Sequence, residues 1–208
     1  MKSLSMLLIS TVLFTSCAGS YYAINPERLN YTAKAEKGGV LLNYRYAVLE
    51  QRGNKKYAKK ETKKHIRVVA INLTNTTGKP VSYNDMSFYA GDKEVFPLEI
   101  NTIHRELKQA AASYLLFLFL TPMNLYTGNS SIPIGLGLGP GIAASNMSRA
   151  ARANNSFKEE LLEKDLTNAV IHSGETVYGV IGFRGISYDP LSIKLKTTDT
   201  DDSMINTN

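Results

Sequence analysis

The segment HIRVVAINLTN, residues 65–75, constrains the fold more than any other stretch of the chain. In a β-strand successive side chains point to opposite faces, so residues two apart share a face. Apolar residues occupy both sets here: Ile66, Val68 and Ala70 on one, and Val69, Ile71 and Leu73 on the other. This pattern predicts a central strand that is buried on both faces.

Other segments have the pattern of strands, turns and helices. Residues 38–50 alternate in hydropathy, and Ala90-Gly91-Asp92-Lys93 forms the expected tip of a hairpin within 87–100. Two late strands are expected, one at 177–183 and one within 186–198. From 101 to 123 and from 146 to 166 the apolar residues recur at three and four, which predicts helices.

Two phrases carry a resemblance to a known fold. AINLTNTTGKPVSYNDMSFYAGDKEVFPL and the later IHSGETVYGVIGF resemble the immunoglobulin-like sandwich domains of small exported bacterial proteins. The fold class we expect is mainly β (α+β): an immunoglobulin-like antiparallel β-sandwich over 38–198, with an inserted helical, glycine-rich hairpin at about 101–166. Residues 199–208 are expected to form a loose polar tail.

The chain begins MKSLSMLLISTVLFTSCAGSYY, which has the layout of a secretory signal: one positive charge, a short apolar run and small residues. Phe14-Thr15-Ser16-Cys17 resembles the lipobox of bacterial lipoproteins, here of the Bacteroides type, in which the cysteine is acylated. The resemblance implies that residues 1–16 are removed and that Cys17, the only cysteine, is the lipid attachment site. The alternative is an ordinary signal peptide, with Cys17 incidental.

The expected location follows from the residues after Cys17. Ala18 stands where the inner-membrane retention signal has Asp, so we expect a lipid-anchored protein of the outer membrane that faces the periplasm, with residues 17–37 as anchor and tether. A net charge of +6 favours lipid phosphates and acidic polysaccharide as contacts. The expected partners are the membrane, through the lipid, and an envelope protein or further copies of the chain, but no nucleic acid.

The helical insertion contains two apolar segments that are candidate contact surfaces. The first is the unbroken run Tyr114, Leu115, Leu116, Phe117, Leu118, Phe119 and Leu120. The second is a loop in which two pairs of glycines, Gly135 with Gly139 and Gly137 with Gly141, are spaced four apart. One interpretation is that this hairpin covers an open face or edge of the sandwich. The other is that it dips into the bilayer or forms oligomers there.

A lysine-rich stretch between the first two strands is a candidate for contact with anionic surfaces. Its lysines are Lys55, Lys56, Lys59, Lys60, Lys63 and Lys64. One interpretation is a solvated hairpin connection. The other is a site for phosphate headgroups, because basic residues are attracted to an anionic membrane surface.

The sequence contains no motif that predicts catalysis, a cofactor or a metal site. There is no G-x-S-x-G elbow, and His65, His104 and His172 lie far apart without an H-E-x-x-H pattern. We therefore expect a non-enzymatic envelope lipoprotein that acts as a binding or assembly module, with the apolar hairpin as its contact surface. The alternative is a membrane-inserting or pore-forming subunit that uses the same hairpin.

Overall fold

The computed structural model describes residues 17–122, 124–127 and 130–196. The expected signal peptide and most of the expected polar tail lie outside these residues. The described chain combines helices with antiparallel sheets and divides into two compact units. We call residues 17–24, 49–64 and 100–163 the helical unit, and residues 25–48, 65–99 and 164–196 the sheet unit.

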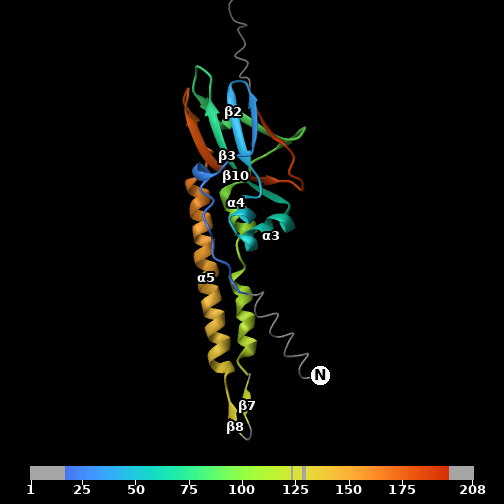
Figure 1. Cartoon of the computed structure of the whole chain (residues 1–208), viewed down its shortest axis with the longest axis vertical. Coiled ribbons are helices and arrows are strands. Elements are labelled where there is room, and N and C mark those ends of the chain that lie inside the picture. Colours follow the sequence, from blue (N-terminus) through green and yellow to red (C-terminus); the bar gives the residue numbers. More distant parts are fainter. Residues whose placement is uncertain (1–16, 123, 128–129, 197–208) are drawn as a thin grey trace, which may run out of the picture. The chain divides into compact units, whose positions relative to one another are not determined.

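The sheet unit contains two main antiparallel sheets (Figure 1). The first sheet has the strand order β1 (Ala33–Lys37), β2 (Val40–Arg45), β3 (Ile66–Asn75), β10 (Thr176–Arg184). The second sheet has the order β11 (Leu191–Leu195), β5 (Met86–Ala90), β6 (Lys93–Val95). A two-stranded ladder joins β4 (Val81–Ser82) to β9 (Val170–Ile171). Short 3-10 helices η1 (Pro26–Arg28) and η2 (Tyr83–Asp85) lie in the connections.

The core of the sheet unit confirms the prediction made for residues 65–75. Strand β3 is central, between β2 and β10, and nine of its ten residues are buried. Val69, Ile71 and Leu73 share one cluster with Phe88 of β5 and Ile193 of β11, so side chains of both main sheets meet in a single core. The predicted hairpin is also confirmed, because β5 and β6 pair through Ala90 and Lys93.

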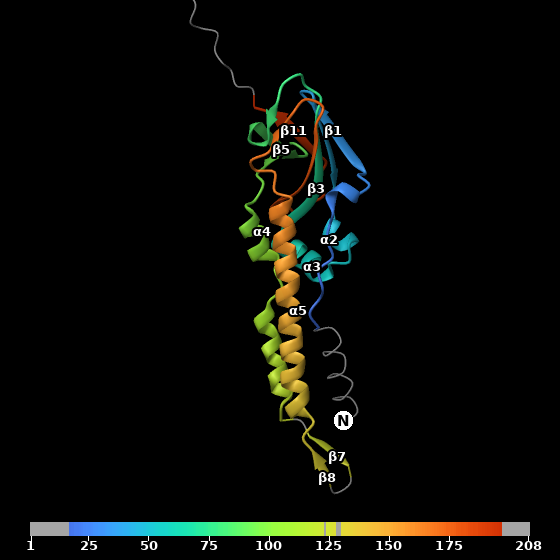
Figure 2. The ribbon, with the colours of Figure 1, turned by 90° about the vertical axis from the view of Figure 1, so that its left-hand side faces the viewer.

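The helical unit contains α3 (Lys55–Lys64), α4 (Ile100–Leu107), the 3-10 helix η3 (Ala111–Leu120) and the long helix α5 (Gly135–Glu163). Between η3 and α5 a small hairpin forms from β7 (Leu125–Thr127) and β8 (Ser130–Ile132). Helix α2 (Val48–Gln51) lies where the chain passes from one unit to the other. Figures 1 and 2 show η3 and α5 side by side, with β7 and β8 at their common end.

Three local structures differ from the sequence-based predictions. The lysine-rich stretch is helix α3 and not a hairpin connection. A helix places Tyr57 and Glu61, which are four residues apart, on the same side, where both are buried, and leaves most of the lysines on the other sides. The predicted helix over 101–123 breaks after Leu107 and continues as the 3-10 helix η3. The predicted glycine-rich loop is the first part of α5, and Pro140 lies inside that helix.

Candidate functional site

The two arms of the apolar hairpin pack against each other within the helical unit. A 3-10 helix has three residues per turn, so Tyr114 and Phe117 of η3 lie on one side, and both are buried. They share a small core with Ala143 and Ala150 of α5. The hairpin is therefore part of the helical unit, where its two arms bury each other's apolar side chains.

Eight other large apolar side chains of the hairpin are exposed. Phe119 is 78% exposed and Leu116 is 65% exposed. The exposed apolar side chains of the hairpin are Leu115, Leu116, Leu118, Phe119, Tyr126, Ile132, Leu136 and Leu138. Leu120 is half-buried. Apolar side chains gathered on one exposed element are typical of an interaction surface.

The glycines of the candidate loop have different positions on α5. Gly135 and Gly139 are buried, and a Cβ atom at Gly139 would lie 2.8 Å from Thr121 Oγ1 and 2.9 Å from the carbonyl oxygen of Phe117. A Cβ atom at Gly141 would meet no described atom within 4 Å. Gly137 lies on the same helix between them. The small residues thus serve partly to bring α5 close to η3 in the same chain.

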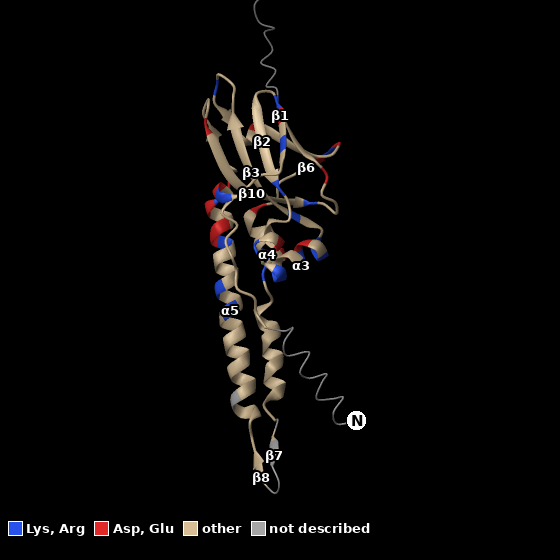
Figure 3. Cartoon of the chain, viewed as in Figure 1, with Lys and Arg blue, Asp and Glu red and all other residues tan. Residues whose placement is uncertain are grey.

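The hairpin is free of charge over its whole length. No Lys, Arg, Asp, Glu or His occurs between Lys108 and Arg149. Figure 3 shows this as the length of α5 and η3 without blue or red, which runs from the β7–β8 end up to the first basic residues of α5. The sequence-based prediction recognised the two apolar runs but missed this wider absence of charge, which can be read directly from the residues.

The segment after Cys17 is bound along the helical unit by buried amide side chains. The backbone N–H of Ala18 donates to Asn146 Oδ1 at 2.7 Å. The side chain of Gln109 pairs with both backbone groups of Gly19: the N–H of Gly19 donates to Oε1 at 3.0 Å, and Nε2 donates to the carbonyl oxygen at 2.7 Å. Asn154 holds the backbone of Gln109 in the same way.

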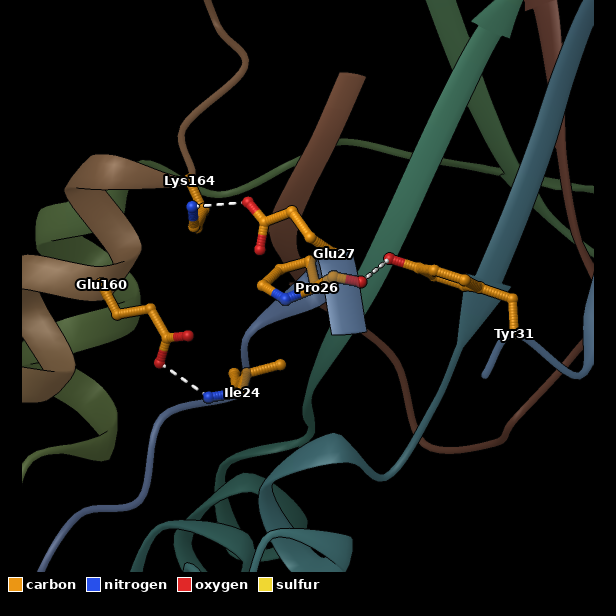
Figure 4. Close-up of polar contacts among 6 residues, drawn as sticks. All are labelled: Ile24, Pro26, Glu27, Tyr31, Glu160 and Lys164. Atoms are coloured by element: carbon orange, nitrogen blue, oxygen red, sulfur yellow. Dashed lines mark hydrogen bonds and ion pairs between the residues drawn. The ribbon is translucent and has the colours of Figure 1, made fainter. Parts of the chain in front are cut away.

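The rest of the segment is bound by similar contacts. Asn54 pairs with both backbone groups of Tyr22 at 2.7 and 2.8 Å. The N–H of Ile24 donates to Glu160 Oε2 at 2.9 Å (Figure 4), and the hydroxyl of Tyr21 donates to the same oxygen. Burial, and then the neighbouring Glu160, raise the pKa of Tyr21 far above its usual range. We call residues 18–24 the strap.

The structure therefore replaces the expected tether over 17–37 with ordered chain. After the strap, η1 and β1 belong to the sheet unit. There the hydroxyl of Tyr31 donates to the carbonyl oxygen of Pro26 at 2.9 Å, and Lys164 Nζ lies 2.6 Å from Glu27 Oε1 (Figure 4). No flexible linker separates Cys17 from the helical unit, because the next residue, Ala18, is hydrogen-bonded to Asn146 and only 4% exposed.

Cys17 lies at the hairpin. The residue is exposed, and its neighbour Ala18 shares a core with Tyr114, Phe117, Ala143 and Ala150. The pKa of Tyr114 is raised by burial and by the nearby Cys17. The expected lipid attachment site and the apolar run are thus neighbours, although about a hundred residues separate them in the sequence.

Two independent features coincide along α5. Asn146 binds the residue that follows Cys17, and Arg149, less than one turn further on, is the first charged residue of the helix. From that level to the β7–β8 end, both arms are without charge. The level at which Ala18 is bound is therefore also the boundary between the charged and uncharged parts of the helical unit.

The predicted basic residues lie on α3, where Lys55, Lys59, Lys63 and Lys64 are exposed and Lys56 and Lys60 are half-buried. Lys60 Nζ donates to the carbonyl oxygen of Lys108, and Lys64 Nζ lies 3.2 Å from Glu106 Oε2. Burial, and then the charges of Lys64 and Lys108, lower the pKa of Lys60. The structure thus brings part of this cluster to the base of the hairpin.

Two kinds of site are absent from the described residues. Within residues 17–122, 124–127 and 130–196, no three His, Cys, Asp or Glu side chains gather as a metal site would require. In the same residues, no helix combines the length and the hydropathy that a bilayer-crossing helix needs.

No family model, curated protein or solved structure matches this chain. The features that bear on function are therefore the strap, the uncharged hairpin and the basic residues at its base.

Proposed function

We propose that the chain is a lipid-anchored protein of the bacterial cell envelope, acylated at Cys17, whose uncharged hairpin enters the bilayer beside the acyl chains. The hairpin fixes a non-enzymatic binding or assembly module on the membrane, at the outer membrane with the sheet unit in the periplasm. Within this proposal the two main sheets form an immunoglobulin-like sandwich. The support for the sandwich is the shared core of β2, β3, β5 and β11.

The observation that carries the proposal is the shared level of the lipid attachment site and the charge boundary on α5. Acyl chains on Cys17 extend into hydrocarbon, so the backbone of Ala18 must lie close to the membrane surface. Ala18 is bound to Asn146, and every residue from there to the hairpin tip is uncharged. A lipid anchor attached without a flexible linker would therefore place the uncharged hairpin in or against the bilayer.

The length of the hairpin suits this position. The helix from Gly135 to Asn146 rises about 18 Å at about 1.5 Å per residue. Strands β7 and β8 extend the hairpin by roughly 10 Å. The sum is comparable to the hydrocarbon thickness of about 30 Å. Tyr126, near the tip, is 73% exposed, and tyrosine is enriched where hydrocarbon meets polar headgroups.

The energy available from the exposed side chains is large. Complete burial of one large apolar side chain contributes about 1.5–3 kcal/mol. Eight such side chains are exposed on the hairpin. Even half-burial in lipid would contribute several kcal/mol, without the cost of an unpaired charge in hydrocarbon. The two strands at the tip pair with each other, which lowers the number of unpaired backbone groups that would enter lipid.

The test labels a cysteine introduced at a chosen position, which is possible because Cys17 is the only native cysteine. If Cys17 is acylated, the mature chain has no free thiol, so an introduced cysteine can be labelled alone with an environment-sensitive fluorophore. We expect Phe119→Cys, on the hairpin, to give a blue-shifted emission that brominated lipids quench. Ser156→Cys, an exposed position on the charged part of α5, is the matched control and should show neither effect. Equal emission at both positions in vesicles would contradict membrane entry, and mass spectrometry of an unmodified Cys17 would contradict the anchor.

A second candidate, assembly of several hairpins in the membrane, is favoured by Gly141. Its outward side is open, and small residues on helices allow close helix–helix packing in lipid. Association would also pair the outer edges of β7 and β8. If the hairpins assemble into a pore, the native chain should release dye from vesicles, and both Leu116→Asp and Gly141→Leu should abolish the release. If the hairpin enters the bilayer but no dye is released, the hairpin fixes the protein on the membrane without forming a pore.

A further inference from the structure

Several basic residues of the helical unit lie next to the groups that bind the start of the strap. Lys56 Cγ lies 3.2 Å from the position that a Cβ atom at Gly19 would occupy. Lys108 directly precedes Gln109, the residue that pairs with Gly19. Lys60 donates to the carbonyl oxygen of Lys108. Arg149 and Arg152 lie on α5 within two turns after Asn146, the residue that binds Ala18. We call Lys56, Lys60, Lys108, Arg149 and Arg152 the basic collar.

Three acidic residues of the helical unit lie at the end of α5 away from the strap's start, whereas Glu106 of α4 is near Lys60. Glu159, Glu160 and Glu163 belong to the last turns of α5, and Glu160 binds Ile24. Figure 3 shows acidic residues gathered at that end of the helix. Glu106 pairs with Lys64, and Glu61 is buried. In the part of the chain that the structure describes, Lys60, Lys108, Arg149 and Arg152 take part in no ion pair. Positive charge thus predominates where the uncharged hairpin begins.

We propose that the basic collar binds the phosphate groups of anionic lipid headgroups when the hairpin is in the bilayer. This inference rests on the proposed function, because membrane entry at the level of Ala18 brings the collar to the headgroup layer. An ammonium or guanidinium group near an anionic surface strengthens binding about fivefold, and salt screens the effect. Guanidinium groups such as those of Arg149 and Arg152 also form two parallel hydrogen bonds with one phosphate.

The experiment measures how the mature chain partitions onto vesicles of phosphatidylcholine, with or without phosphatidylglycerol, at rising salt. Cys17→Ser is used throughout so that the acyl chains do not dominate binding. We expect phosphatidylglycerol to strengthen binding of this chain by roughly two orders of magnitude at low salt. Replacement of Lys56, Lys108, Arg149 and Arg152 by glutamine should remove most of that gain. The matched control replaces Lys34, Lys37, Lys79 and Lys93, four exposed lysines of the sheet unit, and should retain it.

The outcomes separate this inference from the proposed function. A gain from phosphatidylglycerol that the collar variant retains, or that the control variant loses equally, overturns the collar. Saturable binding of inorganic phosphate that competes with vesicles would instead assign the collar to free phosphate. The fluorophore at position 119 reports membrane entry independently, in neutral vesicles as well. Arg149→Gln with Arg152→Gln provides a milder variant, since both side chains are exposed on α5 and their loss leaves the core intact.

Discussion

Gly139 of α5 lies against Thr121 so closely that a Cβ atom at position 139 would stand 2.8 Å from the threonine hydroxyl. A second clash, 2.9 Å from the carbonyl oxygen of Phe117, involves backbone that cannot turn aside. We expect Gly139→Ala to destabilise the helical unit by about 1–3 kcal/mol, because overpacking forces the two arms apart. Urea unfolding followed by circular dichroism measures the change.

Gly141 is the matched control for this substitution. It lies on the same helix, is exposed, and has no described atom within 4 Å of its would-be Cβ. Gly141→Ala should stabilise the unit by up to about 1 kcal/mol, since alanine has the higher helix propensity. If both alanines had the same effect, the arms of the hairpin would not be packed as described.

A second prediction concerns the amide of Gln109, which pairs with both backbone groups of Gly19. Gln109→Ala leaves the half-buried N–H and carbonyl of Gly19 without these partners, which costs about 1–2 kcal/mol. The N-terminal end of the strap should then open locally, and hydrogen exchange at Gly19 should accelerate by at least an order of magnitude. Asn155→Ala, which removes an exposed amide from α5, should leave that exchange rate unchanged.

A third prediction separates two adjacent carboxylates. Glu160 is buried and accepts hydrogen bonds from Tyr21 and Ile24, whereas Glu159 is exposed. Glu160→Ala should destabilise the chain by about 2–3 kcal/mol, because it removes the acceptor of the buried N–H of Ile24 and of the half-buried hydroxyl of Tyr21. Glu159→Ala should stay within about 0.5 kcal/mol of the native chain. Equal losses in thermal unfolding would contradict the binding of the strap through Glu160.

The strands could be predicted from the sequence because their signals are local. Alternation over residues 65–75 and the turn at Ala90–Lys93 depend on near neighbours in the chain, and both were confirmed. The beginning of α5 could not be predicted, since its glycines and Pro140 disfavour a helix. The contact of Gly139 with η3 overrides that preference, and no local pattern encodes it.

The candidate site was predictable in part for the same reason. Cys17, the apolar run and the lysines were visible as types of residue, but their arrangement around the strap was not. Asn54, Gln109, Asn146 and Glu160 are far apart in the sequence, and none belongs to a recognisable motif. The absence of charge between Lys108 and Arg149, by contrast, was available from the sequence and is the signal that marks the hairpin.

The last prediction concerns His104 of α4, whose Nε2 atom is buried without a hydrogen-bond partner among the described residues. Burial, and then the charges of Lys108 and Lys158, lower its pKa below the ordinary value of about 6.5. The unfolded chain therefore binds a proton at a pH where the folded chain does not, so stability falls as the pH drops through about 6.5. Between about pH 7.5 and 5 we expect the melting temperature of the native chain to fall more than that of His104→Gln, which cannot titrate there. A native pH dependence that survives in His104→Gln would assign the effect to another group.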